Sequence, residues 1–377
     1  MTRDGEISCR NKNSGFGLIE IMVAMVIGMF GIIVMMQVLT TFEGQKRSTT
    51  GGSDAQNVGA IALYNVQRDI QQSGYGLSSL TSLGCGLTLP NGVVLSSLAP
   101  VTINPAVITG QDANTDTLLV VYSNTDSPIE GNGVTSQPSQ NTYAVQTASS
   151  FKVGDYIYAL PKNRPAPCNL TVEQVNAVNL PYEVVVPTGM AGAVKGSLFN
   201  LGKTLKILAY AVRNKNLTLC DYTANNCGDA TKNTNSTVWV PIANNIVSLK
   251  AQYGRQDPAS GVINGIIDTY DITTPSIASA TLSCDWLRIS ALRIALVARS
   301  TQFEKGIVTN ATKNITFPNN APKWSGWATN PILGAGTLGP DTQIDENWKH
   351  YRYKVFETTV PLRNVTWMLS QGVKAGC

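Results

Sequence analysis

The stretch GFGLIEIMVAMVIGMFGIIVMMQVL, from Gly15 to Leu39, contains a single charged residue, Glu20. As a helix, residues 16–39 extend about 36 Å at about 1.5 Å per residue, enough to cross a membrane's roughly 30 Å hydrocarbon core. An ionised side chain in such a run is costly unless it finds a partner, so it reads as functional. We therefore expect residues 16–39 to span a membrane and Glu20 to have a role beyond solubility.

The residues before this run distinguish it from an ordinary secretory signal. A secretory signal peptide has a shorter apolar region, and its cleavage site follows that region. Here residues 1–15, MTRDGEISCRNKNSG, are polar and end in a glycine directly before Phe16. The processing site is therefore expected ahead of the apolar run. The alternative is an ordinary signal anchor that carries an incidental glutamate.

The segment SGFGLIEIMVAM resembles the class III signal of type IV prepilins, which combines a polar leader, a glycine, a phenylalanine and a glutamate at the fifth mature position. In that family a membrane prepilin peptidase cuts after the glycine and methylates the new N-terminus. The resemblance implies cleavage between Gly15 and Phe16, with Phe16 methylated. Gly17 departs mildly from the pattern, since many members have threonine there.

The position of Glu20 has a physical rationale in this setting. After cleavage the new α-amine is a cation at the start of an apolar helix. A carboxylate one turn along can neutralise that amine, or the amine of the subunit packed one step ahead, and it complements the positive end of the helix dipole. Glu20 is thus expected to act in assembly, not as a catalytic base.

A second helical pattern follows the charged stretch after Leu39. Its apolar residues recur every fourth position, which is typical of an amphipathic helix: Val58, Ala62, Val66 and Ile70. Asp54 is expected to cap this helix, or to mark where helix resumes after Gly51 and Gly52, and Gly74 and Gly76 to end it. Residues 1–15 are then a leader, 16–39 a transmembrane or fibre-core helix, and 40–76 its amphipathic continuation.

Residues 77–377 are expected to form a β-rich head domain with long loops. Short segments rich in β-branched and aromatic residues predict strands: 117–123, 156–160, 182–187, 205–213, 247–254, 287–300 and 351–364. No strand–helix alternation recurs, so a doubly wound sheet is not expected. The predicted fold class is α+β and type IV pilin-like, a long N-terminal helix followed by a predominantly antiparallel sheet.

Several of these segments look like the PilW group of minor pilins, which is related to the larger pseudopilins of type II secretion. They are RDIQQSGYG, VSLKAQYG, LRIALVARS and YKVFETTVPLRN, whereas residues 129–180 carry little of the resemblance. The resemblance implies a low-abundance subunit that primes fibre assembly with other minor pilins, at the pilus tip. Its partners would be those minor pilins, the major pilin and the prepilin peptidase. A tip adhesin or a DNA-uptake receptor is the alternative.

That resemblance also implies a location. The protein would sit in the inner membrane through one pass, with its head in the periplasm, and in the pilus at the cell surface after assembly. Without the leader, Lys+Arg falls from 28 to 25 and Asp+Glu from 24 to 22, a net charge of +3. This charge is too weak to indicate a nucleic-acid site by itself.

Six cysteines remain once Cys9 leaves with the leader, and an even number outside the cytoplasm indicates disulfides. The candidates are Cys85, Cys168, Cys220, Cys227, Cys284 and Cys377. Fifteen connectivities are possible, and free thiols are the alternative. Cys220 and Cys227 bracket a polar turn and are the best local pair.

The sequence gives no support for an enzyme, a cofactor or a metal. His350 is the single histidine and is expected at a solvated strand edge, and no P-loop or G-x-S-x-G pattern occurs. GAGTLG (334–339) matches G-x-G-x-x-G but lies in a Gly/Pro-rich loop. Asp257, Asp268 and Asp271 are expected in a turn between strands, and a calcium site is the alternative, although their spacing does not match a calcium-binding loop. Trp324, Trp327 and Trp348 are expected to be buried anchors of an irregular loop, and an exposed contact surface for a partner subunit or ligand is the alternative.

Overall fold

The computed structural model describes residues 15, 17–77, 79–125, 128, 130–163, 167–260, 263–279, 281–309 and 347–365. The chain divides into two units, Met1–Thr50 and Gly51–Cys377, and each is described by itself. The element that belongs to both is helix α1, Leu18–Gln72. By length and composition, α1 is the one helix among the described residues that could cross a membrane.

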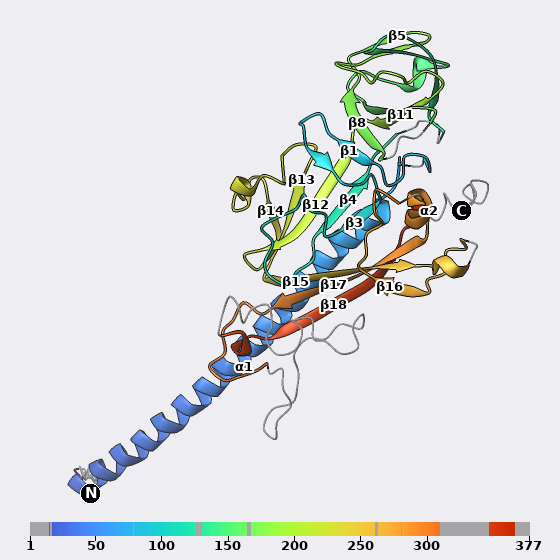
Figure 1. Ribbon diagram of the computed structural model, residues 1–377. Coiled ribbons are helices and arrows are strands. Elements are labelled where there is room, and N and C mark those ends of the chain that lie inside the picture. Colours follow the sequence, from blue (N-terminus) through green and yellow to red (C-terminus); the bar gives the residue numbers. More distant parts are fainter. Residues whose placement is uncertain are drawn as a thin grey trace, which may run out of the picture. The chain divides into compact units, whose positions relative to one another are not determined.

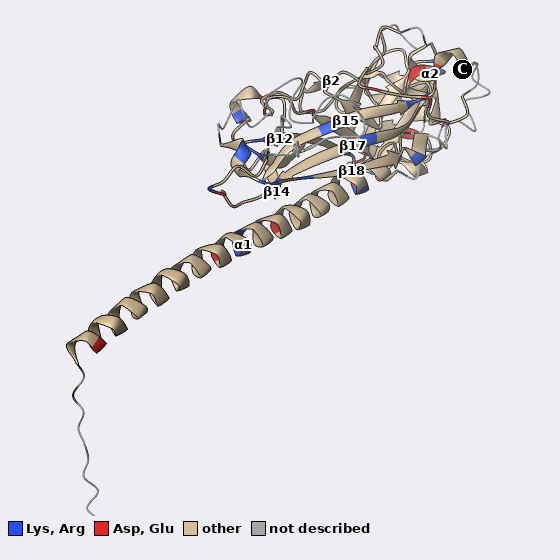
Figure 2. Ribbon diagram, turned by 90° about the horizontal axis from the view of Figure 1, so that it is seen from below, with Lys and Arg blue, Asp and Glu red and all other residues tan. Residues whose placement is uncertain are grey.

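Within the first unit, the apolar part of α1 has exposed side chains. From Leu18 to Leu39 every described side chain is exposed. Figure 2 shows that charged residues are sparse along the early turns of the helix and more frequent further along it. A helix that is hydrophobic all round is stable only where lipid or other helices cover it.

The second half of α1 packs on the head domain through small residues. Its buried positions are Gly51, Ala55, Gly59, Ala62, Val66, Asp69 and Ile70. Three of the four residues in the predicted stripe are among them, and the fourth, Val58, packs at the margin of the same core. The amphipathic pattern therefore identified the face that the helix buries.

The prediction that Asp54 caps a separate helix is wrong, because α1 runs through Gly51 and Gly52 without a break. The reason is tertiary packing. A Cβ at Gly51 would lie 3.3 Å from the Cβ of Ser300, and one at Gly59 only 2.1 Å from Cε2 of Phe356. Glycine in a helix costs about 1 kcal/mol relative to alanine, but here it lets the helix backbone approach the neighbouring strand.

Two antiparallel sheets and α1 enclose the main core (Figure 1). The first sheet has five strands, in the order β14 (Val240–Asn244), β13 (Asn216–Asp221), β12 (Lys206–Arg213), β4 (Leu118–Tyr122) and β3 (Val101–Ile103). The second has four, in the order β16 (Thr269–Asp271), β15 (Ile246–Arg255), β17 (Ile289–Arg299) and β18 (Tyr353–Pro361). A short helix, α2 (Leu282–Leu287), precedes β17.

A third, nine-stranded sheet is built mostly from one insertion. In order it contains β2 (Val94–Leu95), β1 (Gly86–Thr88), β8 (Asn169–Gln174), β7 (Tyr156–Leu160), β11 (Ser197–Gly202), β5 (Asn132–Ser139), β6 (Thr142–Val145), β10 (Glu183–Val185) and β9 (Ala177–Asn179). Strands β4 and β12 are antiparallel neighbours in which Tyr122 pairs with Lys206. Residues 123–205 therefore leave and re-enter the five-stranded sheet at one point, and we call them the inserted lobe.

The inserted lobe has a hydrophobic core of its own around Tyr143, Phe151 and Leu198. It shares a second cluster with the five-stranded sheet and with the segment around β1. Strand β1 pairs with β8 of the lobe in parallel, the one parallel pair among the described strands. Four single turns of 3-10 helix complete the described elements: η1 (Ala148–Ser150), η2 (Ala230–Lys232), η3 (Pro258–Ser260) and η5 (Trp348–His350).

The predicted fold class is confirmed as a long N-terminal helix followed by a mostly antiparallel β-rich domain. Each predicted strand segment contains an observed strand. Side chains of β18 alternate between its two faces: Phe356 and Val360 face the main core, while Val355 packs against a small cluster around Val297 on the other face.

Candidate processing and assembly site

The processing signal surrounds the start of α1. Gly15 and Gly17 are described, whereas Phe16 lies outside the described residues. The backbone N–H of Gly17 lies 3.4 Å from Oε2 of Glu20, and the N–H of Glu20 donates to the carbonyl of Gly17 at 2.9 Å. This is the half of a capping box in which a carboxylate at the third helical position reaches back to the residue before the helix.

The carboxylate of Glu20 therefore lies beside the first residues of α1, where the N-terminus of the helix begins. The side chain is exposed and lies in the first turn, where a negative charge is favoured by the helix dipole. Further along, Thr40 and Thr41 both donate to the carbonyl of Gln37 at 2.9 Å, so these hydroxyls are satisfied within the helix. The surface offered by this part of α1 is apolar with one anionic group at its beginning.

The other end of α1 is fixed to the head by a buried carboxylate. Asp69 is only 4% exposed. The hydroxyl of Tyr210 on β12 donates to its Oδ2 at 2.5 Å, and Arg68 donates to its Oδ1 at 3.2 Å through both Nε and Nη2. Burial, followed by the charge of Asp69, raises the pKa of Tyr210 well above its usual value. Tyr210 thus stays a hydrogen-bond donor.

This anchor was missed at the sequence level, although a signal for it exists. Asp69 precedes Ile70 and follows Val66 by three positions, so it lies on the edge of the apolar stripe. A carboxylate at such a position must find donors when it is buried. The partner, however, is 141 residues away along the chain and is not marked by any local pattern.

Two disulfides lie within the described residues. Cys220 and Cys227, the local pair expected from the sequence, are joined across the turn after β13. Cys85 is joined to Cys168, with a sequence separation of 83, and this bond fastens the inserted lobe beside the parallel pair of β1 and β8. Cys284 is also disulfide-bonded, with a partner outside the described residues, where Cys377 also lies.

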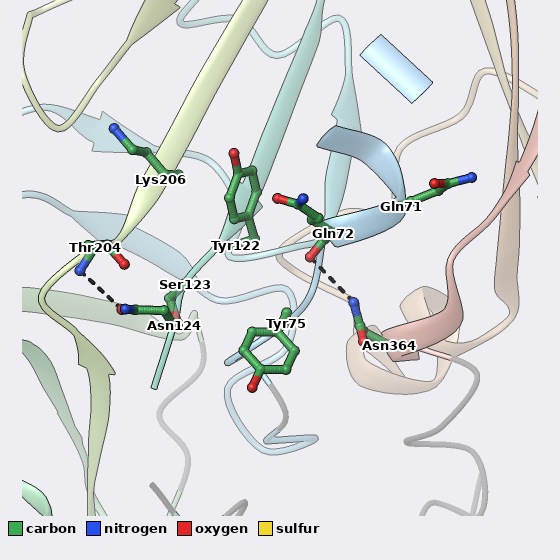
Figure 3. A pocket seen from close by; sticks show the side chains of 9 residues that line it. All are labelled: Gln71, Gln72, Tyr75, Tyr122, Ser123, Asn124, Thr204, Lys206 and Asn364. Carbon is green, nitrogen blue, oxygen red and sulfur yellow. Dashed lines mark hydrogen bonds between the residues drawn. The ribbon is translucent and has the colours of Figure 1, made fainter. Parts of the chain in front are cut away.

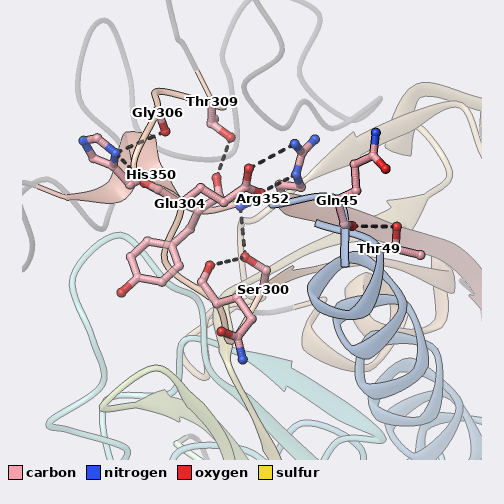
Figure 4. Close-up of polar contacts among 10 residues, drawn as sticks. Gln45, Thr49, Ser300, Glu304, Gly306, Thr309, His350 and Arg352 are labelled. Carbon is pink, nitrogen blue, oxygen red and sulfur yellow. Dashed lines mark hydrogen bonds and ion pairs between the residues drawn. The ribbon is translucent and has the colours of Figure 1, made fainter. Parts of the chain in front are cut away.

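His350 is held in a structural role. Its Nδ1 lies 2.8 Å from the carbonyl of Glu304 and 3.2 Å from that of Gly306 (Figure 4). Its ring stacks on Phe303. The backbone thus accepts from the ring nitrogen that faces it, and Glu304 itself pairs with Arg352 at 2.6 Å. The half-buried ring is not the solvated edge residue that the sequence suggested.

The three aspartates after β15 are occupied by local contacts. The N–H of Asp257 donates to Oδ2 of Asp268 at 2.9 Å, and Asp271 pairs with Arg255 at 2.8 Å. The part of the chain that the structure describes contains no group of three or more possible metal ligands among His, Cys, Asp and Glu. Among the late tryptophans, Trp348 is buried, whereas Trp324, Trp327 and the GAGTLG loop lie outside the described residues.

Comparisons with known proteins agree with this arrangement. The family described as Type IV Pilus-assembly protein W matches residues 209–364, and the Prokaryotic N-terminal methylation motif matches residues 10–36. A search of curated proteins finds no match. Among solved structures, a type IV-like pilin from Thermus thermophilus is similar at 11% identity, over 83% of this chain and 96% of that one. Its TM-score is 0.31.

The methylation motif, the apolar helix and the β-rich head define a pilin-like, membrane-anchored component of a type IV pilus system. Such a motif implies processing by a prepilin peptidase and assembly with other pilins. Within this class, residues 209–364 are similar to the PilW family of type IV pilus-assembly proteins. The family is structural and is not known for enzymes.

Proposed function

We propose that this protein is a minor pilin that initiates pilus assembly together with other minor pilins and occupies the pilus tip. In this proposal residues 1–15 are removed after Gly15, and Phe16 becomes the methylated N-terminus. Residues 16–39 cross the inner membrane once, with the head in the periplasm until assembly carries the protein into the pilus.

The observation that carries the proposal is the exposed apolar part of α1 with Glu20 at its start. Such a helix can leave the lipid only if other helices cover it, and its single carboxylate needs a cation from its own or a neighbouring N-terminus. The first few subunits face the largest barrier, because no fibre yet exists to cover them. A dedicated group of minor pilins would lower this barrier.

The inserted lobe supports a position at the tip. It branches from the sheet beside the C-terminal end of α1, where the N–H of Gly74 donates to the carbonyl of Val121 and that of Ser123 to Tyr75, both at 2.9 Å. Figure 1 shows strands β5, β8 and β11 of the lobe beyond that end of the helix. A subunit stacked ahead would need this space for its own head, so we infer that this chain suits the first position.

Counting pili by electron microscopy in a deletion strain tests the proposal. Deletion should reduce the number of surface pili, and additional loss of the retraction motor should partly restore them, because slow unprimed assembly then accumulates. If the head serves mainly as an adhesin, deletion will leave pilus number unchanged and abolish only attachment. Normal piliation in the deletion strain would therefore contradict the proposed role.

A further inference from the structure

The head contains a pocket of about 560 Å³ at the point where α1 ends. Its walls come from the last turn of α1, the ends of β4 and β12 at the base of the inserted lobe, and Asn364 after β18. We call it the helix-end pocket. Figure 3 shows Gln72 and Asn364 on one side of two phenol rings, Tyr75 and Tyr122, with Asn124 and Thr204 on the other. Its volume lies within the usual range for small-molecule sites.

The helix-end pocket carries no unbalanced charge. Its single ionic side chain is Lys206, whose Nζ lies 2.8 Å from Oδ2 of Asp221 and is therefore paired. Every other lining side chain is a carboxamide, a hydroxyl or a phenol. The site thus lacks the cationic groups that recognise a phosphate or carboxylate, and the free anionic groups that recognise a cation.

One buried lining group has no partner. Ser123 is 3% exposed, and its Oγ makes no hydrogen bond although it is fully enclosed. Buried hydroxyls are nearly always hydrogen-bonded, and leaving one unpaired costs about 1–3 kcal/mol. Because this oxygen is enclosed, Ser123 forms part of the wall and offers a ligand in the pocket no hydrogen-bonding group.

The carboxamides are already oriented by the backbone. Oδ1 of Asn124 accepts from the N–H of Thr204 at 3.2 Å, which leaves its amide hydrogens for a ligand. The amide group of Asn364 donates to the carbonyls of Gln72 and Ser73, at 3.3 and 2.9 Å, which leaves its oxygen as an acceptor. Donors and acceptors thus stand pre-organised on opposite sides, which reduces the ordering entropy that binding must overcome.

The two tyrosines add flat apolar surface. Tyr75 is 53% exposed, and Tyr122 is half-buried. Burial, reinforced by the charge of Asp69, raises the pKa of Tyr122 to about 12, so its hydroxyl stays neutral at physiological pH. An aromatic ring with a polar tip suits ligands that have both an apolar face and hydroxyl groups.

We propose that the helix-end pocket binds a neutral sugar unit of a glycan. A pyranose ring has C–H faces that can lie on the tyrosine rings and equatorial hydroxyls that both donate and accept. That combination matches the uncharged amides and the phenols of the lining. This inference does not rest on the proposed role in assembly, because a priming subunit needs no glycan.

Ligand-observed saturation-transfer NMR on the full mature chain tests the inference. The detergent must carry no sugar headgroup, since a maltoside could itself occupy the pocket. N-acetylglucosamine and galactose serve as probes, and glycerol, which has hydroxyls but no ring, is the control. We expect saturation transfer to at least one sugar and none to glycerol.

The variant Tyr75→Ala should weaken sugar binding about tenfold or more, equivalent to about 1.4 kcal/mol. Because Tyr75 is exposed, the variant should fold, and unchanged thermal unfolding checks this. The matched control is Tyr182→Ala, whose tyrosine is 58% exposed in the inserted lobe and does not line the pocket. Binding lost in the first variant and kept in the second supports the inference. Absence of transfer to either sugar, equal transfer to glycerol, or full binding by Tyr75→Ala overturns it.

Discussion

Glu20 is the residue for which the cost of an ionised group in an apolar helix most directly suggests a role, pairing with an α-amine. Its carboxylate lies 3.4 Å from the N–H of Gly17 in the unprocessed chain. In the proposed processing, removal of the leader leaves a positively charged α-amine on Phe16, the residue directly before Gly17 in the sequence. When lipid or neighbouring helices cover this part of α1, a carboxylate with such a partner is tolerable, and one without it is not.

We expect Glu20→Ala to be inserted and processed normally but to be recruited poorly, because a neighbouring amine loses its counter-charge. Co-purification with the other minor pilins and pilus number per cell are the measurements. Glu43→Ala is the matched control, since Glu43 is an exposed carboxylate further along the same helix. Wild-type recruitment of the Glu20 variant would refute the pairing role.

The contact between Asp69 and Tyr210 is the second critical residue-scale feature. Tyr210→Phe keeps the ring but removes the short hydrogen bond, leaving the buried carboxylate with Arg68, whose side chain is 54% exposed. We expect a loss of about 1–3 kcal/mol in the free energy of unfolding, measured by urea titration with tryptophan fluorescence. Tyr64→Phe, at a tyrosine that is 65% exposed on the same helix, should change little. Equal stability of both variants would contradict the anchor.

The same tyrosines predict the pH dependence of stability. Burial raises the pKa of Tyr210 well above normal and that of Tyr122 to about 12. Above about pH 10 the unfolded chain loses these protons while the folded chain keeps them. The contribution of these two tyrosines to the free energy of unfolding is therefore fully present below about pH 10. It is lost as the pH rises through about 12 and beyond. Tyr210→Phe should make this alkaline decline shallower; an unchanged decline would argue against the assignment.

At the scale of elements, two glycines of α1 have opposite environments. A Cβ at Gly59 would lie 2.1 Å from Phe356 of β18, whereas Gly52 has nothing within 4 Å. Gly59→Ala should destabilise the head by about 1–3 kcal/mol through overpacking. Gly52→Ala should be neutral or stabilise it by up to about 1 kcal/mol, because alanine favours helix. Urea unfolding of both variants is the measurement, and stabilisation by both would show that α1 does not pack closely on β18.

The two disulfides are expected to contribute different amounts to the free energy of unfolding. In the chain-entropy account, the bond between Cys85 and Cys168, which closes a loop of separation 83, contributes about 4–5 kcal/mol. The bond between Cys220 and Cys227, of separation 7, contributes about 2–3 kcal/mol. Replacing each pair by serines and comparing unfolding free energies tests this order. Peptide mapping without reductant should also find Cys284 bonded; free thiols at Cys220 and Cys227 would contradict the structure.

Local patterns predicted the elements but not how distant ones meet. The fourfold spacing of Ala62, Val66 and Ile70 and the alternation in β18 are properties of neighbouring residues, so they could be read directly. The processing signal is equally local. In contrast, the hydrogen bond from Tyr210 to Asp69 and the parallel pairing of β1 with β8 join residues far apart in sequence. Long-range packing at Gly51 and Gly59 also stabilises an unbroken α1, despite the low intrinsic helix propensity of glycine.

At the scale of the whole molecule, the inserted lobe and the helix-end pocket were not foreseen. The strands of the lobe resemble any other β-rich segment, and the register of Tyr122 with Lys206 reveals the insertion only in three dimensions. The pocket lies at the base of this insertion and takes residues from four separate parts of the chain. No continuous motif could have indicated it.

In the proposed function, this protein begins the fibre and stays at its end. Immunogold electron microscopy of sheared pili tests it most directly, with an epitope inserted in the turn after β9, where Leu180 is 70% exposed. Wild-type pilus number in the tagged strain serves as the control that the insertion is harmless. We predict gold at a single end of labelled fibres. Gold spaced along the shafts, or fibres that never carry it, would contradict the account.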